Sequence, residues 1–170
     1  CVADLWGGQR DAAGAPWLGM PVAEIGALDR VLVLGSTLRK DHPLIANRLR
    51  QSTKKSMQLS LIHSVDDDLL MRVAAKAIVA PSAMPAMLAQ VLKAAAQARH
   101  AALPEAVRGA VEGVAVSGAA QAIADSLVSG QNAAVFLGNF AQHHAMASQL
   151  HALAQALAAV TGARFGFLGE

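Results

Sequence analysis

The sequence has few of the residues that disulfide frameworks, metal clusters and nucleic-acid surfaces require. One cysteine in 170 residues fits a reducing compartment and excludes a zinc or iron–sulfur site built from several thiolates in this chain. Four Phe and two Trp offer no aromatic stacking surface, and a formal charge of +2 on scattered Lys and Arg makes no basic stripe. No apolar run reaches eighteen residues. We therefore expect no nucleic-acid partner and no direct membrane insertion.

Apolar residues, by contrast, are abundant. They make up 54% of the chain, which is enough to bury a core without a disulfide or a metal, and the length fits one domain. Neither end carries a tail or a signal peptide, so we expect residues 1–170 to be a single α/β domain excised from a longer subunit. The density of Gly and Pro over residues 1–29 predicts an irregular N-terminal segment with one short helix near residues 21–25.

A strand, a glycine turn and a helix follow one another in the first third of the chain. The apolar run Val31–Leu34 predicts a strand covered on both faces, and Gly35 ends it. Pro43 suits the first position of a helix, which should end near Thr53. Apolar and polar residues alternate over Met57–Ile62 and predict a second strand. These pieces form one β-α-β unit with a right-handed crossover.

The rest of the chain continues the alternation of helices and strands. Apolar residues recur at helical spacing over 84–95 and 119–128, a buried strand is expected over Ala133–Leu137, and a long helix from about Phe140 onward. The carboxylates of Asp66–Asp68 suit the start of a further helix. The fold class predicted from this order is α/β: a Rossmann-like, mainly parallel sheet with helices on both faces.

The pattern strand, glycine, polar residue, helix occurs twice, and it marks the candidate ligand site. In open parallel sheets ligands gather at the carboxyl ends of the strands, where free helix amides favour an anion. The candidate cofactor-binding residues are Gly35, Ser36, Thr37, Gly138 and Asn139. The first turn lacks the later glycines of G-x-G-x-x-G and the Gly-Lys-Ser/Thr of a P-loop, which disfavours an ordinary dinucleotide or nucleoside triphosphate site.

No metal site and no catalytic residue is predicted. His144 and His151 share a helix face, but seven residues of helix rise about 10.5 Å, too far for two ligands of one zinc ion. Consecutive carboxylates at Asp66–Asp68 point in different directions and favour a solvated surface. No Ser-His-Asp or Cys-His set can be assembled from the sequence.

One string of residues carries a family resemblance. Leu38-Arg39-Lys40-Asp41-His42-Pro43, within residues 35–51, closely resembles the large iron–sulfur subunit of bacterial NADH:quinone oxidoreductase, respiratory complex I. Residues 16–25, 66–82, 138–162 and 168–170 also look like the C-terminal half of that subunit. The resemblance covers most of the chain.

The resemblance implies a domain fragment with the fold of molybdopterin oxidoreductases such as formate dehydrogenase. In those enzymes the turn before the His-Pro helix start approaches a pterin dinucleotide. Here Thr37 stands where they usually have Asn, and Arg39 and Lys40 could obstruct a dinucleotide. The resemblance therefore implies a vestigial site at the five candidate residues and no cofactor in this fragment. Iron–sulfur clusters are expected in the N-terminal part of the parent subunit.

The function that the resemblance implies is structural. The fragment would fill out the peripheral arm of the complex that moves electrons from NADH to quinone, on the cytoplasmic side of the bacterial inner membrane. Its partners would be other subunits of that arm. Two alternatives remain open: a molybdopterin-dinucleotide-binding domain of a formate-dehydrogenase-like oxidoreductase, which would use the same five residues, and an ordinary NAD-binding domain.

Overall fold

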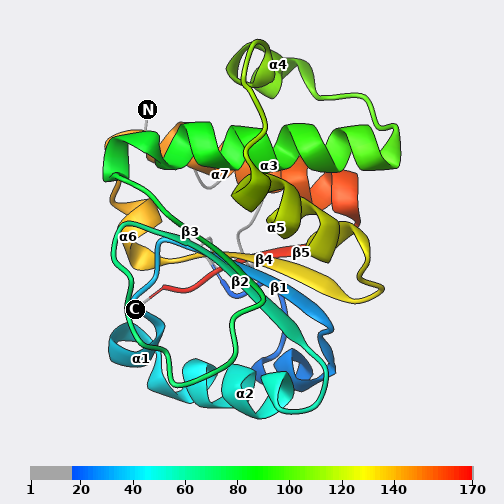
Figure 1. Ribbon diagram of the computed structural model, residues 1–170. Helices are drawn as coiled ribbons and strands as arrows, with labels where there is room; N and C mark the ends of the chain where they lie inside the picture. Colours follow the sequence, from blue (N-terminus) through cyan, green and yellow to red (C-terminus); the bar gives the residue numbers. More distant parts are fainter. Residues whose placement is uncertain (1–16, 170) are drawn as a thin grey trace.

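A computed structural model describes residues 17–169, and a five-stranded parallel sheet forms its centre (Figure 1). The strands are β1 (Arg30–Leu34), β2 (Gln58–His63), β3 (Ala75–Ile78), β4 (Ala133–Leu137) and β5 (Arg164–Phe167). Their order in the sheet is β3-β2-β1-β4-β5, and all four pairings are parallel. The prediction of a Rossmann-like α/β fold is therefore confirmed.

Helices cover both faces of the sheet. Figure 1 shows α3 (Met84–Arg99), α5 (Gly118–Val128) and α7 (Ala147–Thr161) on one face. The opposite face carries α1 (Leu38–Asp41), α2 (Pro43–Thr53) and the 3-10 helix η2 (Val22–Ala27). The remaining short helices are η3 (Pro81–Ala83), α4 (Glu105–Val111), which lies outside α3, and α6 (Asn139–Gln142). No described helix has the length and the apolar character that a bilayer crossing needs.

Two apolar cores lie on the two sides of the sheet, because successive strand residues point to opposite faces. Leu32 and Leu34 of β1 contribute to the core under α3, α5 and α7, whereas Val31 and Val33 contribute to the core over α2. All five residues of β4 are buried, as expected of a strand covered on both faces.

The N-terminal segment predicted over residues 1–29 lies partly outside the described residues, which begin at residue 17. Its described part contains one short helix, η2 (Val22–Ala27), close to the one that the sequence predicts near residues 21–25. The backbone around Leu18 packs against β5: Phe167 N–H donates to Trp17 O at 3.0 Å, and an added Cβ at Gly166 would collide with Leu18 O.

The expectation of one long helix from Phe140 is wrong, because the chain breaks between α6 and α7. The imidazole of His144 explains the break. Its Nδ1 accepts the backbone N–H of Met146 at 2.9 Å, and its Nε2 lies 3.0 Å from Pro81 O. The imidazole thus accepts the Met146 N–H, which in a continuous helix would donate to a backbone carbonyl one turn earlier.

The expectation of a helix after Asp66–Asp68 is also wrong. The chain runs from β2 to β3 through an irregular loop, in which Leu70 has a positive φ of 52°. Its local hydrogen bond is a turn bond, from Leu70 N–H to Asp68 Oδ1 at 2.9 Å. An Asp side chain that bonds the backbone two residues on favours a turn over a helix.

Candidate functional site

The two glycine turns lie side by side at the carboxyl ends of β1 and β4. The two strands pair in register, with Leu34 beside Leu137, so Gly35 and Gly138 leave the sheet at the same edge. Gly138 N–H donates to Leu34 O at 2.8 Å, and Gly35 N–H donates to Ile62 O at 2.9 Å. The order of the strands reverses here, and this is where open α/β sheets bind their ligands.

The two turns pack tightly against each other and against α6. A Cβ added at Gly138 would lie 2.7 Å from the Cα of Ser36 and closer still to its Cβ and to Gly35 O. A Cβ added at Gly35, where φ is +61°, would lie 2.7 Å from Ala141 N and 2.8 Å from Ala141 Cβ. Glycine is needed at both positions for one backbone to approach the other. At these two positions one backbone therefore lies directly against another.

The two helix starts at this edge offer little to an anion. Both α1 and α6 are four residues long, which leaves almost no helix dipole. The carboxylate of Asp41 already accepts the N–H of Thr37 at 3.2 Å, and the Arg39 guanidinium donates to Asp68 O at 2.6 Å in the β2–β3 loop. A negative group within the chain thus takes the place that a phosphate would take.

The structure brings the five candidate residues, Gly35, Ser36, Thr37, Gly138 and Asn139, to one edge of the sheet. Their packing shows a junction between two turns. Their role in holding a cofactor remains a prediction.

Three buried polar side chains lie at or near these turns, and one of them, His63, was not found from the sequence. Ser36 Oγ, His42 Nε2 and His63 Nδ1 are buried and have no hydrogen-bond partner among the described residues. His63 ends β2, and its ring meets Phe140 edge-on at a centroid distance of 5.6 Å. The signal that could have found it is its position as the last residue of a strand at the ligand edge.

Burial keeps two histidines neutral. Desolvation lowers the pKa of His63, and the nearby carboxylates of Asp67 and Asp41 only partly oppose this effect. Desolvation also lowers the pKa of His151. Its ring packs against the rings of Phe165 and Phe167, with a centroid distance of 5.4 Å to each. In the folded state the protonated, charged form of each imidazole is poorly hydrated, so burial disfavours it.

We expect stability to fall as the pH drops below the ordinary histidine pKa of 6.5. The unfolded chain then binds protons that the folded chain refuses, so the free energy of unfolding decreases until the lowered folded pKa is reached. Each histidine contributes a slope of at most about 1.4 kcal/mol per pH unit. Urea unfolding at pH 7.5 and pH 5 measures the effect.

The matched variants for this measurement are His151→Leu and His100→Gln. His151→Leu should reduce the pH slope, because it removes one of the two buried imidazoles. His100→Gln, at an exposed position, is the control. If His151→Leu left the dependence of stability on pH unchanged, the lowered pKa of His151 would be contradicted.

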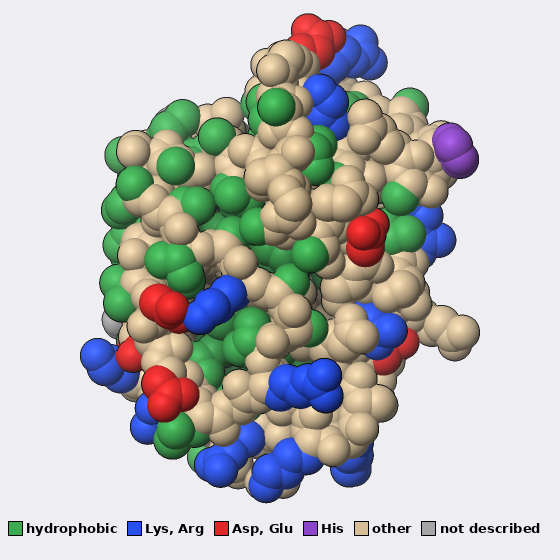
Figure 2. Space-filling model, viewed as in Figure 1, with side chains coloured by type: hydrophobic (Ala, Val, Ile, Leu, Met, Phe, Trp, Pro, Cys, Tyr) green, Lys and Arg blue, Asp and Glu red, His purple; other side chains and the backbone are tan. Residues whose placement is uncertain are grey.

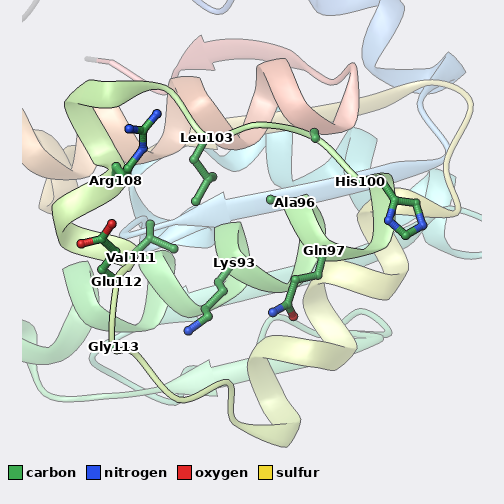
Figure 3. A pocket seen from close by; sticks show the side chains of 10 residues that line it. Lys93, Ala96, Gln97, His100, Leu103, Arg108, Val111, Glu112 and Gly113 are labelled. Carbon is green, nitrogen blue, oxygen red and sulfur yellow. The ribbon is translucent and has the colours of Figure 1, made fainter.

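A hollow of about 620 Å³ lies elsewhere, between the C-terminal half of α3 and α4 (Figure 3). Leu103 and Val111 form part of its apolar lining. Lys93 Nζ donates to Val114 O at 2.7 Å. In Figure 3 the polar ends of Lys93, Arg108 and Glu112 point in different directions and converge on no common spot. The hollow thus lacks the few convergent polar groups that fix a small ligand.

No group of three or more His, Cys, Asp or Glu side chains able to hold a metal occurs between residues 17 and 169. The histidines weighed for a metal in the sequence have other contacts. His144 bonds to backbone groups, and the ring of His151 packs against Phe165 and Phe167.

Comparison with known proteins supplies a fold and no family. No protein-family model matches the chain, and no curated protein sequence matches it. Among solved structures, the chain is similar to one from the formyltransferase/hydrolase complex (FhcABCD) of Methylorubrum extorquens, determined in complex with methylofuran. The TM-score is 0.59 and the identity 15%, and the match covers 98% of this chain and 42% of that chain. This chain therefore spans less than half the length of its structural neighbour.

These comparisons overturn the functional interpretation drawn from the sequence. The structural neighbour belongs to a formyltransferase/hydrolase complex, not to NADH:quinone oxidoreductase and not to a formate dehydrogenase. The physical reason for the error is that a strand, a glycine turn and a proline-started helix describe one corner of a parallel sheet. Many functions are built on that corner. At 15% identity the likeness establishes the α/β fold of this chain and nothing more.

Proposed function

We propose that this domain is a non-catalytic structural module that docks other protein chains within a larger assembly. The observation that carries the proposal is the tight packing at the switch point of the sheet, where the turn at Gly138 lies directly on Gly35 and Ser36. A domain that binds a dinucleotide needs open space and free amides there. Here one backbone lies directly against the other, and Asp41 takes the Thr37 amide.

The structural neighbour adds support of a different kind. It is a chain of a multi-subunit complex, and the present fold accounts for less than half of it. We infer protein partners for this domain on the same basis.

Thermal unfolding in the presence of NADH, GTP and a pterin tests the proposal. A ligand at a hundred times its Kd stabilises a protein by about 2.7 kcal/mol, which raises the Tm of a chain of this size by roughly 5–10 °C. We expect changes below about 1 °C for all three ligands, because the two turns are packed together. A saturable rise in Tm with any of them would show an open ligand site and refute the proposal.

A further inference from the structure

Six of the fourteen Lys and Arg residues of this protein lie on one face, which we call the basic face. Its six members are exposed and lie on α1, α2 and the two residues after α2: Arg39, Lys40, Arg48, Arg50, Lys54 and Lys55. With Asp41 as the one acidic residue, residues 39–55 carry a formal charge of +5. The whole chain carries +2, so all other residues together carry −3. Figure 2 shows Lys and Arg gathered over this side of the molecule.

The basic face is not neutralised within the described part of the chain. The ion pairs there join Lys76 to Asp66, Arg108 to Glu105 and Arg164 to Glu24, and none involves the basic face. Six unpaired cations so close together repel one another, and a negatively charged partner would relieve that repulsion.

Exposed aliphatic side chains accompany these charges. Leu44 of α2 is 79% exposed, and Val22 of η2 is 44% exposed. Both line a groove of about 470 Å³ between η2 and α2, together with Arg48 and Lys55. Leu44 and Arg48 are four residues apart on one side of α2, and Lys55 lies two residues after the end of that helix. The groove therefore offers an apolar contact at one end and cations along its length.

A second, smaller groove lies on the other side of α2. It has a volume of about 160 Å³, and its lining includes Arg39, Arg50 and Leu70. Leu70 is 51% exposed. Both sides of the helix thus combine positive charge with an exposed aliphatic side chain.

The mixture of charge and aliphatic surface favours a protein over the other anionic partners. A nucleic acid would gain charge contacts but no stacking, because no member of the basic face or its grooves is aromatic. A membrane-surface helix presents a continuous apolar face to lipid, whereas α2 buries Ala46 and Leu49 against its own sheet.

We propose that the basic face docks an acidic protein segment that also carries apolar side chains. The apolar side chains contact Leu44 and Val22, and the carboxylates lie against Arg48 and Lys55. The inference deepens the proposed docking function and rests on it. Charge complementarity of this kind accelerates association and selects the partner, while apolar contacts hold the complex together.

Fluorescence anisotropy with a labelled amphipathic peptide tests the proposal. The peptide carries Glu on its polar face and Leu on its apolar face, and a companion peptide has Gln in place of Glu. We expect the acidic peptide to bind in a salt-dependent way and the companion to bind at least about tenfold more weakly. No binding of the acidic peptide, or equal binding of both, would overturn the proposal.

Variants of the protein locate the binding. Arg48→Glu with Lys55→Glu should weaken binding about tenfold or more, and Leu44→Ser about fivefold through lost apolar contact. The control with an equal charge change, Arg99→Glu with Arg108→Glu, lies on α3 and α4 and should change binding less than about twofold. If the control weakened binding as much as Arg48→Glu with Lys55→Glu, the proposal would be overturned.

Two further probes separate the competing partners. A single-stranded DNA oligonucleotide and phosphatidylserine vesicles should both bind more weakly than the peptide. Tighter binding of either, insensitive to Leu44→Ser, would overturn the proposal in favour of that partner.

A photocrosslinking experiment addresses the partner in the cell. The full chain carries p-benzoylphenylalanine in place of Leu44, and mass spectrometry identifies the segment attached to it. The proposal expects an acidic segment whose attachment is lost with Arg48→Glu and Lys55→Glu. Attachment to a neutral or basic segment, or none at all, would overturn it. A ligand-induced rise in Tm in the nucleotide assay would instead refute the tight packing of the two turns and leave these results standing.

Discussion

Gly138→Ala is expected to lower the free energy of unfolding by about 3 kcal/mol, the upper part of the usual range for overpacking. The φ of Gly138 is −85°, which alanine adopts without strain, so the effect is steric. The new methyl would lie against the Cα and Cβ of Ser36 and against Gly35 O, which cannot rotate away. Urea unfolding followed by circular dichroism measures the change.

Two controls make this measurement specific. Gly109→Ala lies in α4 with no atom near the added methyl, and it should stabilise the protein by up to about 1 kcal/mol through helix propensity. The double variant Gly138→Ala, Ser36→Gly removes one of the colliding atoms and should recover part of the loss. Equal stability of Gly138→Ala and the parent would show that the two turns are not packed together.

Phe136→Ala is expected to lower the free energy of unfolding by about 4 kcal/mol, because it leaves a cavity in the core on one face of the sheet. Phe136 lies in β4 with 0% of its surface exposed and is among the largest fully buried side chains of the described residues. Calorimetry or denaturant unfolding at pH 7.5 measures the loss.

Phe140→Ala is the matched control for the core variant. Phe140 lies just past the end of the same strand and is 38% exposed, with ring contacts to His63 and His144. Its truncation should cost about 1 kcal/mol, since it loses ring contacts and leaves no enclosed cavity. Equal losses for the two variants would contradict the placement of Phe136 in the core.

The central strands could be predicted from the sequence because their signals are local. The runs at Val31–Leu34 and Ala133–Leu137 are continuous and apolar, as full burial on both faces demands. The edge strands β3 and β5 have no such signal. Each has four residues, and β3 alternates between exposed and partly buried or buried positions. Such short strands form through their pairing with β2 and β4, which residue patterns do not report.

The candidate site shows the same division. The two glycine turns are visible as repeated local patterns, and their arrival at one edge follows from parallel strands. His63, which the fold buries beside them, has no motif of its own. The complex I interpretation relied on the string Leu38–Pro43 and took a corner of the fold as evidence of function.

Net charge was misleading for a similar reason. A formal charge of +2 with scattered Lys and Arg argues against a basic surface when the chain is considered as a whole. The fold places the six cations of residues 39–55 on one side of the sheet, so a chain with a small net charge has a positive face.

Periodicity and apolar runs in the amino-acid order were thus enough for the α/β class, the three inner strands and the glycine turns, because each depends on neighbours along the chain. The contact between the two glycine turns and the burial of His63 beside Phe140 arise from segments far apart in sequence. Only the folded chain could decide them, since whether a turn holds a ligand depends on what packs against it.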